Sequence, residues 1–140
     1  MKLTEYKMKY AKSDRQIDMT GARMTPVAAL LSLYAEYNDD SVFVLLCGEK
    51  VGIKGFVRLP KDIDQIELNS ETIKAATDAK VSTVIVGARH DWPAFKDMEK
   101  TLKAHGIHLL NGIIIGKDSY YLFHQDQVYR YGDYGLGCDL

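Results

Sequence analysis

Two short apolar runs constrain the fold of this chain more than any other feature. They are Ser41-Val-Phe-Val-Leu-Leu-Cys47 and Val81-Ser-Thr-Val-Ile-Val86. The first is almost wholly apolar, the second is rich in β-branched residues, and both are too short for an ordinary helix, so they are typical of buried strands. A strand that is apolar on both faces needs cover on both faces, which is typical of α/β proteins. The sequence therefore predicts strands buried within a covered sheet.

The rest of the chain alternates strand and helix signals. Helices are expected over 25–37, with Thr25 as cap and Pro26 in its first turn, over 68–79, with Asn69 or Ser70 as cap, and over 91–105, closed by a left-handed Gly106. Strands are expected over 3–10, 41–47, 51–57 and 81–86, followed by a meander over 107–131. The order β-α-β-β-α-β-α-β-β, with a further final strand as an option, predicts the α/β class. We expect one mixed-sheet α/β sandwich domain over 1–140, with an N-terminal strand and loop over 1–24 and a tail over 132–140.

The overall charge gives no general attraction to nucleic acid or anionic lipid. With 18 basic and 19 acidic residues the net charge is −1, so such binding would need a local patch. The N-terminus offers a patch made of Lys2, Lys7, Lys9, Lys12 and Arg15. Lysines on an edge strand also prevent pairing between molecules. The patch therefore predicts either a nucleic-acid binder or a protected edge.

Cysteine content and hydropathy indicate the compartment. Cys47 lies in an apolar run and Cys138 lies in the tail, and two such residues make no disulfide framework. The first residues contain no apolar signal core, and no apolar run reaches the roughly 18 residues of a membrane span. We therefore expect a cytoplasmic protein that does not enter a membrane.

Two segments of the chain, LNSETIKAATDAKVSTVIVGARHD and HGIHLLNGIIIGKDSYYLF, carry a family resemblance. Through them, and from about residue 25 to residue 131, the chain resembles the C-terminal domain of the RadC family, which has the JAB/MPN metalloprotease-like fold. The segment LNSETIKAATDAKVSTVIVGARHD is similar to the helix, apolar strand and His-x-His-Pro loop of that family. The segment HGIHLLNGIIIGKDSYYLF is similar to its closing strands and is the more specific of the two. The resemblance implies a domain of RadC type.

The metal motif of that superfamily is incomplete in this chain. Catalytic members hold zinc and its water with an early Glu, two His of a His-x-His element and an Asp that follows a Ser. Here the His-x-His element reads Ala88-Arg89-His90, the Glu falls near Gly55, and the Asp corresponds at best to Asp97. Catalytic zinc needs three firm protein ligands. The resemblance therefore implies a pseudoenzyme that holds no metal and no other cofactor.

The loop after Val86 offers a binding corner at the carboxyl end of a strand, where α/β proteins place their sites. It contains Arg89, His90, Asp91 and Trp92. Arg89 suits a phosphate or carboxylate group, and Trp92 suits stacking. The same residues could instead start a helix, with Asp91 as cap, Trp92 over the core and Pro93 in the first turn.

The tail adds aromatic residues suited to an interface. Tyr129 and Tyr131 fit a strand that completes the sheet, whereas Tyr134 fits a contact with a partner or a second copy in a homo-oligomer. Together with the corner, these residues predict a binding protein for a macromolecule or a small ligand. RadC-like genes commonly travel on phages and other mobile elements, so the resemblance also implies an anti-defence role against a host.

Two other functions remain open on the sequence. His90, Asp91 and Asp97 could form a rearranged hydrolase site, with a metal or by acid/base chemistry. The basic N-terminal strand could bind nucleic acid, in which case the affinity would fall steeply as salt rises.

Overall fold

All strands described here belong to one mixed sheet. The computed structural model describes residues 2–6, 12–18, 25–48, 52–89, 93–125 and 127–132. Across these residues the strand order is β2-β1-β4-β3-β5-β6-β7-β8. The strands are β1 (Lys2–Tyr6), β2 (Lys12–Asp18), β3 (Val42–Cys47), β4 (Ile53–Leu59), β5 (Thr83–Ala88), β6 (His108–Ile115), β7 (Ser119–His124) and β8 (Gln127–Gly132). The predicted α/β class and mixed sheet are confirmed.

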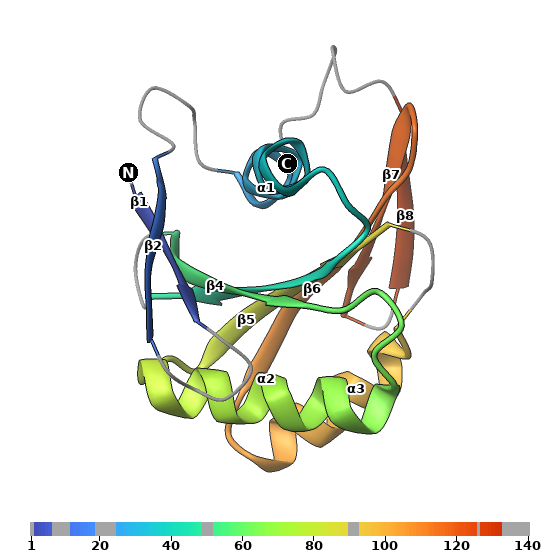
Figure 1. The fold of residues 1–140 in the computed structure, drawn as a ribbon. Helices are drawn as coiled ribbons and strands as arrows, with labels where there is room; N and C mark the ends of the chain where they lie inside the picture. The colour runs from blue at the N-terminus through green and yellow to red at the C-terminus, as the bar shows by residue number, and fades with distance from the viewer. Residues whose placement is uncertain are drawn as a thin grey trace.

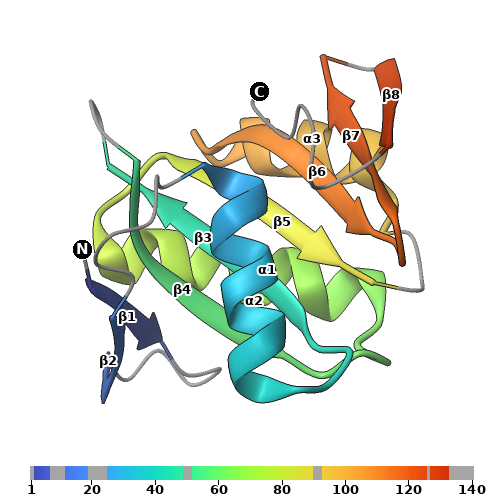
Figure 2. The ribbon, with the colours of Figure 1, turned by 90° about the horizontal axis from the view of Figure 1, so that it is seen from above.

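Helices cover both faces of the sheet. They are α1 (Pro26–Tyr37), α2 (Gln65–Ala79) and α3 (Phe95–Ala104). Figure 1 shows α1 on one face and α2 with α3 on the other, while β7 and β8 curve toward the side of α1. Figure 2 views the sheet from the side of α1, which crosses over β3, β4 and β5. The sandwich therefore has a one-helix layer and a two-helix layer.

The central strands are buried on both faces, as the apolar runs predict. β5 lies between β3 and β6, antiparallel to the first and parallel to the second. Along β3, Phe43 and Leu45 pack toward α1, whereas Val42, Val44 and Leu46 pack toward α2 and α3. Two apolar clusters, one on each side of the sheet, form the core.

Local signals fix the first two helices. Thr25 caps α1 by accepting a hydrogen bond from the Ala28 N–H at 3.1 Å, as predicted. The cap of α2 is Asp64, which accepts from the Glu67 N–H at 2.7 Å, so the prediction of Asn69 or Ser70 is wrong. An Asp before a helix satisfies the free N–H groups of the first turn, and α2 therefore begins about a turn earlier than its apolar residues indicate.

Helix α3 begins later than predicted. Its cap position is Ala94, whose side chain makes no capping bond. The Ala94 N–H instead donates to the side-chain oxygen of Gln65 at 2.8 Å, so the start of α2 supplies the missing acceptor. Gly106 has a φ of 74°, which confirms the left-handed residue after the helix.

The N-terminal region differs from the prediction. The sequence predicts a loop over 12–18, but these residues form β2, which pairs antiparallel with β1. Their sequence, Lys-Ser-Asp-Arg-Gln-Ile-Asp, shows no apolar alternation. A polar edge strand is held by backbone hydrogen bonds rather than by an apolar face, so it leaves little sequence signal. Residues 7–10, the second half of the predicted strand 3–10, lie outside the described residues.

The remaining strands agree with the predicted hairpins. β3 and β4 pair antiparallel, and β6, β7 and β8 form the closing meander. The Gly116 N–H donates to the Ser119 carbonyl at 2.8 Å, which closes the turn between β6 and β7. Within the described part of the chain, the helices are too short or too polar to cross a membrane.

Candidate functional site

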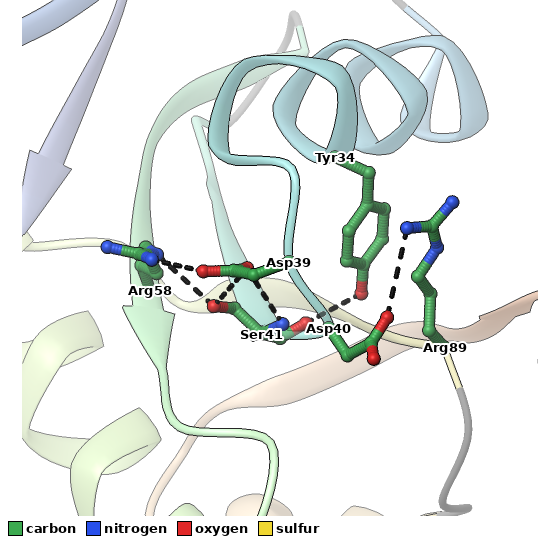
Figure 3. A network of polar contacts seen from close by, with 6 residues as sticks. All are labelled: Tyr34, Asp39, Asp40, Ser41, Arg58 and Arg89. Atoms are coloured by element: carbon green, nitrogen blue, oxygen red, sulfur yellow. Dashed lines mark hydrogen bonds and ion pairs between the residues drawn. The ribbon is translucent and has the colours of Figure 1, made fainter.

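A polar network lies at the ends of three central strands, where β4 and β5 end and β3 begins. Figure 3 shows its six residues, which are Tyr34, Asp39, Asp40, Ser41, Arg58 and Arg89. Asn38 ends α1 in the left-handed conformation with a φ of 52°, and the chain then passes Asp39 and Asp40 on its way into β3. The loop after α1 therefore brings two carboxylates to the carboxyl ends of two strands.

Two tyrosine–arginine–aspartate groups flank this loop. The Arg58 stack consists of Tyr37, Arg58 and Asp39, and the Arg89 stack consists of Tyr34, Arg89 and Asp40. Each guanidinium lies over its tyrosine ring, with its carbon atom 4.2 Å from the centroid for Arg58 and 4.8 Å for Arg89. Both rings pack on Phe43 of β3, with centroids 5.0 Å away for Tyr34 and 5.8 Å away for Tyr37. One turn of α1 separates the tyrosines, which spaces the two stacks.

The Arg58 stack is tied into a hydrogen-bonded network. Arg58 pairs with Asp39 through Nη2 and donates from Nε to the Ser41 hydroxyl at 3.1 Å. The Ser41 hydroxyl and N–H donate to one oxygen of Asp39 at 2.6 and 3.0 Å. Burial alone would raise the pKa of Asp39, but the hydrogen bonds from Ser41 and Arg58 outweigh it and lower that pKa below its usual value. Asp39 therefore remains ionised at neutral pH.

The Arg89 stack is looser. The Arg89 guanidinium nitrogen lies 3.8 Å from the Asp40 carboxylate, beyond hydrogen-bond distance. The side chains of Arg89 and Arg58 are nevertheless almost equally exposed, at 36% and 37%. Arg89 thus combines a contact with the Tyr34 ring and a side chain that is about one-third exposed.

Tyr34 holds the loop between α1 and β3 in place through a buried hydrogen bond. Its hydroxyl donates to the Ser41 carbonyl at 2.7 Å, and both groups are buried. Burial is the main reason that the pKa of Tyr34 lies well above its ordinary value, although Arg89 opposes the shift. Tyr34 is therefore a neutral donor at any physiological pH.

A close approach of α1 to β5 sets the position of Tyr34 relative to Arg89. A Cβ atom on Gly87 would come within 2.4 Å of the Leu30 side chain. The glycine therefore lets α1 pack against the strand one turn before Tyr34. A shallow hollow of about 450 Å³ opens beside the network, and Asp39, Arg58, Lys61 and Asp62 are among its lining residues.

The structure places only part of the predicted corner. Arg89 is the first residue after β5 and turns toward α1. His90, Asp91, Trp92 and Tyr134 lie outside the described residues. Asp97 is exposed in the first turn of α3, which belongs to the opposite layer of the sandwich. Arg89 and Asp97 are therefore not brought together.

The RadC resemblance assigns metal ligands to the positions of Gly55, Ala88, His90 and Asp97. His90 lies outside the described residues, and of the other three only Asp97 has a side chain that can bind a metal. Ala88 is 2% exposed and packs in the apolar cluster beneath α2 and α3. Gly55 is buried in the middle of β4, paired with Thr4 and Leu46. Across the described ranges no three His, Cys, Asp or Glu side chains lie close enough to hold a metal ion.

Sequence reasoning missed Asp39, Asp40 and Arg58. A signal was present in the Asn-Asp-Asp-Ser run that follows α1, since such residues commonly bind backbone and side chains after a helix end. The arginine partners of Asp39 and Asp40 lie 19 and 49 positions further along the chain, so the run alone does not identify them. Comparison of the chain with protein-family models, curated proteins and solved structures gave no match.

Proposed function

We propose that this protein binds an anionic group of a macromolecule or a small ligand at the Arg89 stack, without catalysing a reaction on it. One observation carries the proposal: the Arg89 guanidinium is oriented by the Tyr34 ring yet has no hydrogen bond to Asp40 at 3.8 Å. Arginine binds carboxylate and phosphate through paired N–H groups in one plane. A guanidinium held in place in advance also loses less entropy when a ligand binds.

Asp40 has a definite role in this proposal. In the free protein its carboxylate partly neutralises Arg89 and keeps the side chain over Tyr34. A ligand oxygen that approaches within hydrogen-bond distance would interact more strongly with the guanidinium than Asp40 does, because short charge-assisted bonds are stronger than a 3.8 Å contact. Asp40 therefore keeps Arg89 in position for a ligand and reduces the affinity for that ligand only modestly.

The sequence around Arg89 suits a larger contact area. His90, Asp91 and Trp92 follow directly, and Tyr134 lies in the tail. Central Arg and aromatic side chains supply most of the energy of many interfaces. We expect Arg89→Ala or Trp92→Ala to weaken partner binding by about 2 kcal/mol, roughly 30-fold. The basic residues Lys7 and Lys9 should matter little.

The proposed ancestry is that of a RadC-like domain whose chemistry is lost. The ancestry rests on the sequence resemblance, and the loss of chemistry on Ala88 and Gly55, neither of which supplies a ligand atom from its side chain. A fold that keeps its packing residues and loses its reactive ones is suited to binding. The anti-defence role on a mobile element is part of the same proposal.

The binding proposal can be tested without knowing the partner. Inorganic phosphate and acetate are titrated at constant ionic strength while the arginine Nε–H signals are followed by ¹⁵N NMR. We expect a saturable shift at Arg89 and a much smaller one at Arg58, which is the internal control of equal exposure. Equal shifts at both arginines, or no saturation at Arg89, would contradict the proposal. The Nε–H signal that is missing from the spectrum of the Arg89→Ala variant is assigned to Arg89.

A further inference from the structure

The two edge strands of the sheet differ in how they are protected. β2 contains four charged residues in seven, whereas β8, Gln127-Val-Tyr-Arg-Tyr-Gly132, contains one, Arg130. β8 pairs with β7 on one side, and no strand of the described residues lies on its other side. Charged residues on an edge strand prevent sheets from joining. β8 has little of this protection.

Apolar side chains are exposed on both faces of β8. Val128 is 55% exposed and Tyr129 is 46% exposed. Consecutive residues of a strand point to opposite faces, so a second strand laid against β8 would cover one of these side chains on each face. Figure 1 shows β7 and β8 at the end of the sheet, curving away from α2 and α3.

The β7–β8 turn determines which backbone groups of β8 face outward. His124 lies opposite Gln127 across two turn residues, and Gln125 has a φ of 49°. In a two-residue hairpin the closing pair exchanges hydrogen bonds, and every second residue does the same. The backbone groups of Gln127, Tyr129 and Tyr131 therefore point to β7. Those of Val128 and Arg130 point outward.

We propose that β8 pairs with β8 of a second copy of this chain, antiparallel, about a two-fold axis beside Tyr129. Val128 of each copy then exchanges hydrogen bonds with Arg130 of the other. Tyr129 of one copy then lies opposite Tyr129 of the other as a non-hydrogen-bonded pair. The side chains of such pairs lie closer together than those of hydrogen-bonded pairs, and aromatic residues in these positions stabilise a sheet.

Charge disfavours the neighbouring register on the Arg130 side. A shift by two residues in the pairing would place Arg130 opposite Arg130 on the axis, and like charges directly opposite each other destabilise a sheet. In the proposed register each Arg130 lies opposite Val128. The interface of one short strand pair is smaller than that of stable complexes, so the dimer is reversible and depends on concentration.

A disulfide trap tests the register. Tyr129→Cys is prepared in a Cys138→Ser background, with Gln127→Cys as the matched control on the same face of β8. Cys47 remains, since it is buried and burial raises the pKa of its thiol to about 11. With oxidised glutathione, the variant at 129 should form a covalent dimer on a non-reducing gel and the variant at 127 should not. Equal cross-linking at both positions, or none at 129, overturns the proposal.

Sedimentation velocity tests the pairing without a new thiol. Val128→Glu places a carboxylate opposite Arg130 of the second copy and should tighten the dimer, whereas Val128→Lys should weaken it by roughly tenfold. Thermal unfolding of both variants verifies that the monomer is folded. Equal weakening by the two variants would reject the register. A parent protein that stays monomeric overturns the proposal, even if β8 then binds an extended peptide of another protein.

Discussion

The Arg58 stack and the Arg89 stack use the same three residue types with different results. Both guanidinium groups lie over a tyrosine of α1, and both are about one-third exposed. Arg58 shares Asp39 with Ser41 in a closed network, whereas Arg89 faces Asp40 at 3.8 Å. Hydrogen bonding to the aspartate, rather than composition or exposure, therefore distinguishes the Arg58 stack from the Arg89 stack.

The largest difference between the stacks should appear when their carboxylates are removed. Asp39→Ala removes the acceptor of Ser41 and Arg58, and hydrogen bonds to a charged group contribute about 1.5–3 kcal/mol. We expect a loss of about 2 kcal/mol in the free energy of unfolding, measured with urea. Asp40→Ala should cost less than about 1 kcal/mol, as for an exposed ion pair. Equal losses would show that the two stacks are equivalent.

Tyr34→Phe tests the buried bond beneath the Arg89 stack. The change leaves the Ser41 carbonyl without its 2.7 Å donor, and a buried polar group without a partner costs about 1–3 kcal/mol. Thermal and urea unfolding should both show the loss. An unchanged stability would mean that the hydroxyl does not anchor the loop.

Replacing each arginine by lysine sharpens the comparison. A lysine keeps the charge but donates from a single nitrogen, so it loses the planar fork with which Arg58 reaches Ser41 and Asp39 from two nitrogens. Arg58→Lys should therefore cost about 1 kcal/mol of stability, and Arg89→Lys no more than about 0.5 kcal/mol. Arg89→Lys should instead weaken the phosphate response in the NMR titration. If stability falls more for Arg89→Lys than for Arg58→Lys, the assignment of roles is reversed.

The smallest effect concerns pH. Because the folded state lowers the pKa of Asp39, this carboxylate contributes stability above the pKa of an unfolded Asp, and the contribution is lost as pH falls through the lower folded value. Between neutral pH and acid, the parent should lose more stability than Asp39→Asn. The measurement is the urea midpoint at several pH values. If the urea midpoints of the parent and of Asp39→Asn fall equally with pH, Asp39 is not the cause of the pH dependence.

Several elements could be predicted because their signals are local. Thr25 and Pro26 fixed the start of α1, Gly106 fixed the end of α3, and the apolar runs predicted β3 and β5 in the covered sheet. The prediction missed β2 and placed the start of α2 too late. β2 depends on pairing with β1, and Asp64 stands before the apolar residues that marked α2.

The sequence by itself determined the covered sheet and the presence of its three helices, because burial patterns and helix signals are properties of short segments. The tertiary structure alone decided what Arg89 contacts. Tyr34 and Asp40 lie about 50 residues before it in the chain. They meet it because α1 crosses β5 at Gly87 and the following loop returns to the same edge of the sheet. Such contacts depend on the packing of distant elements, for which no short segment contains the information.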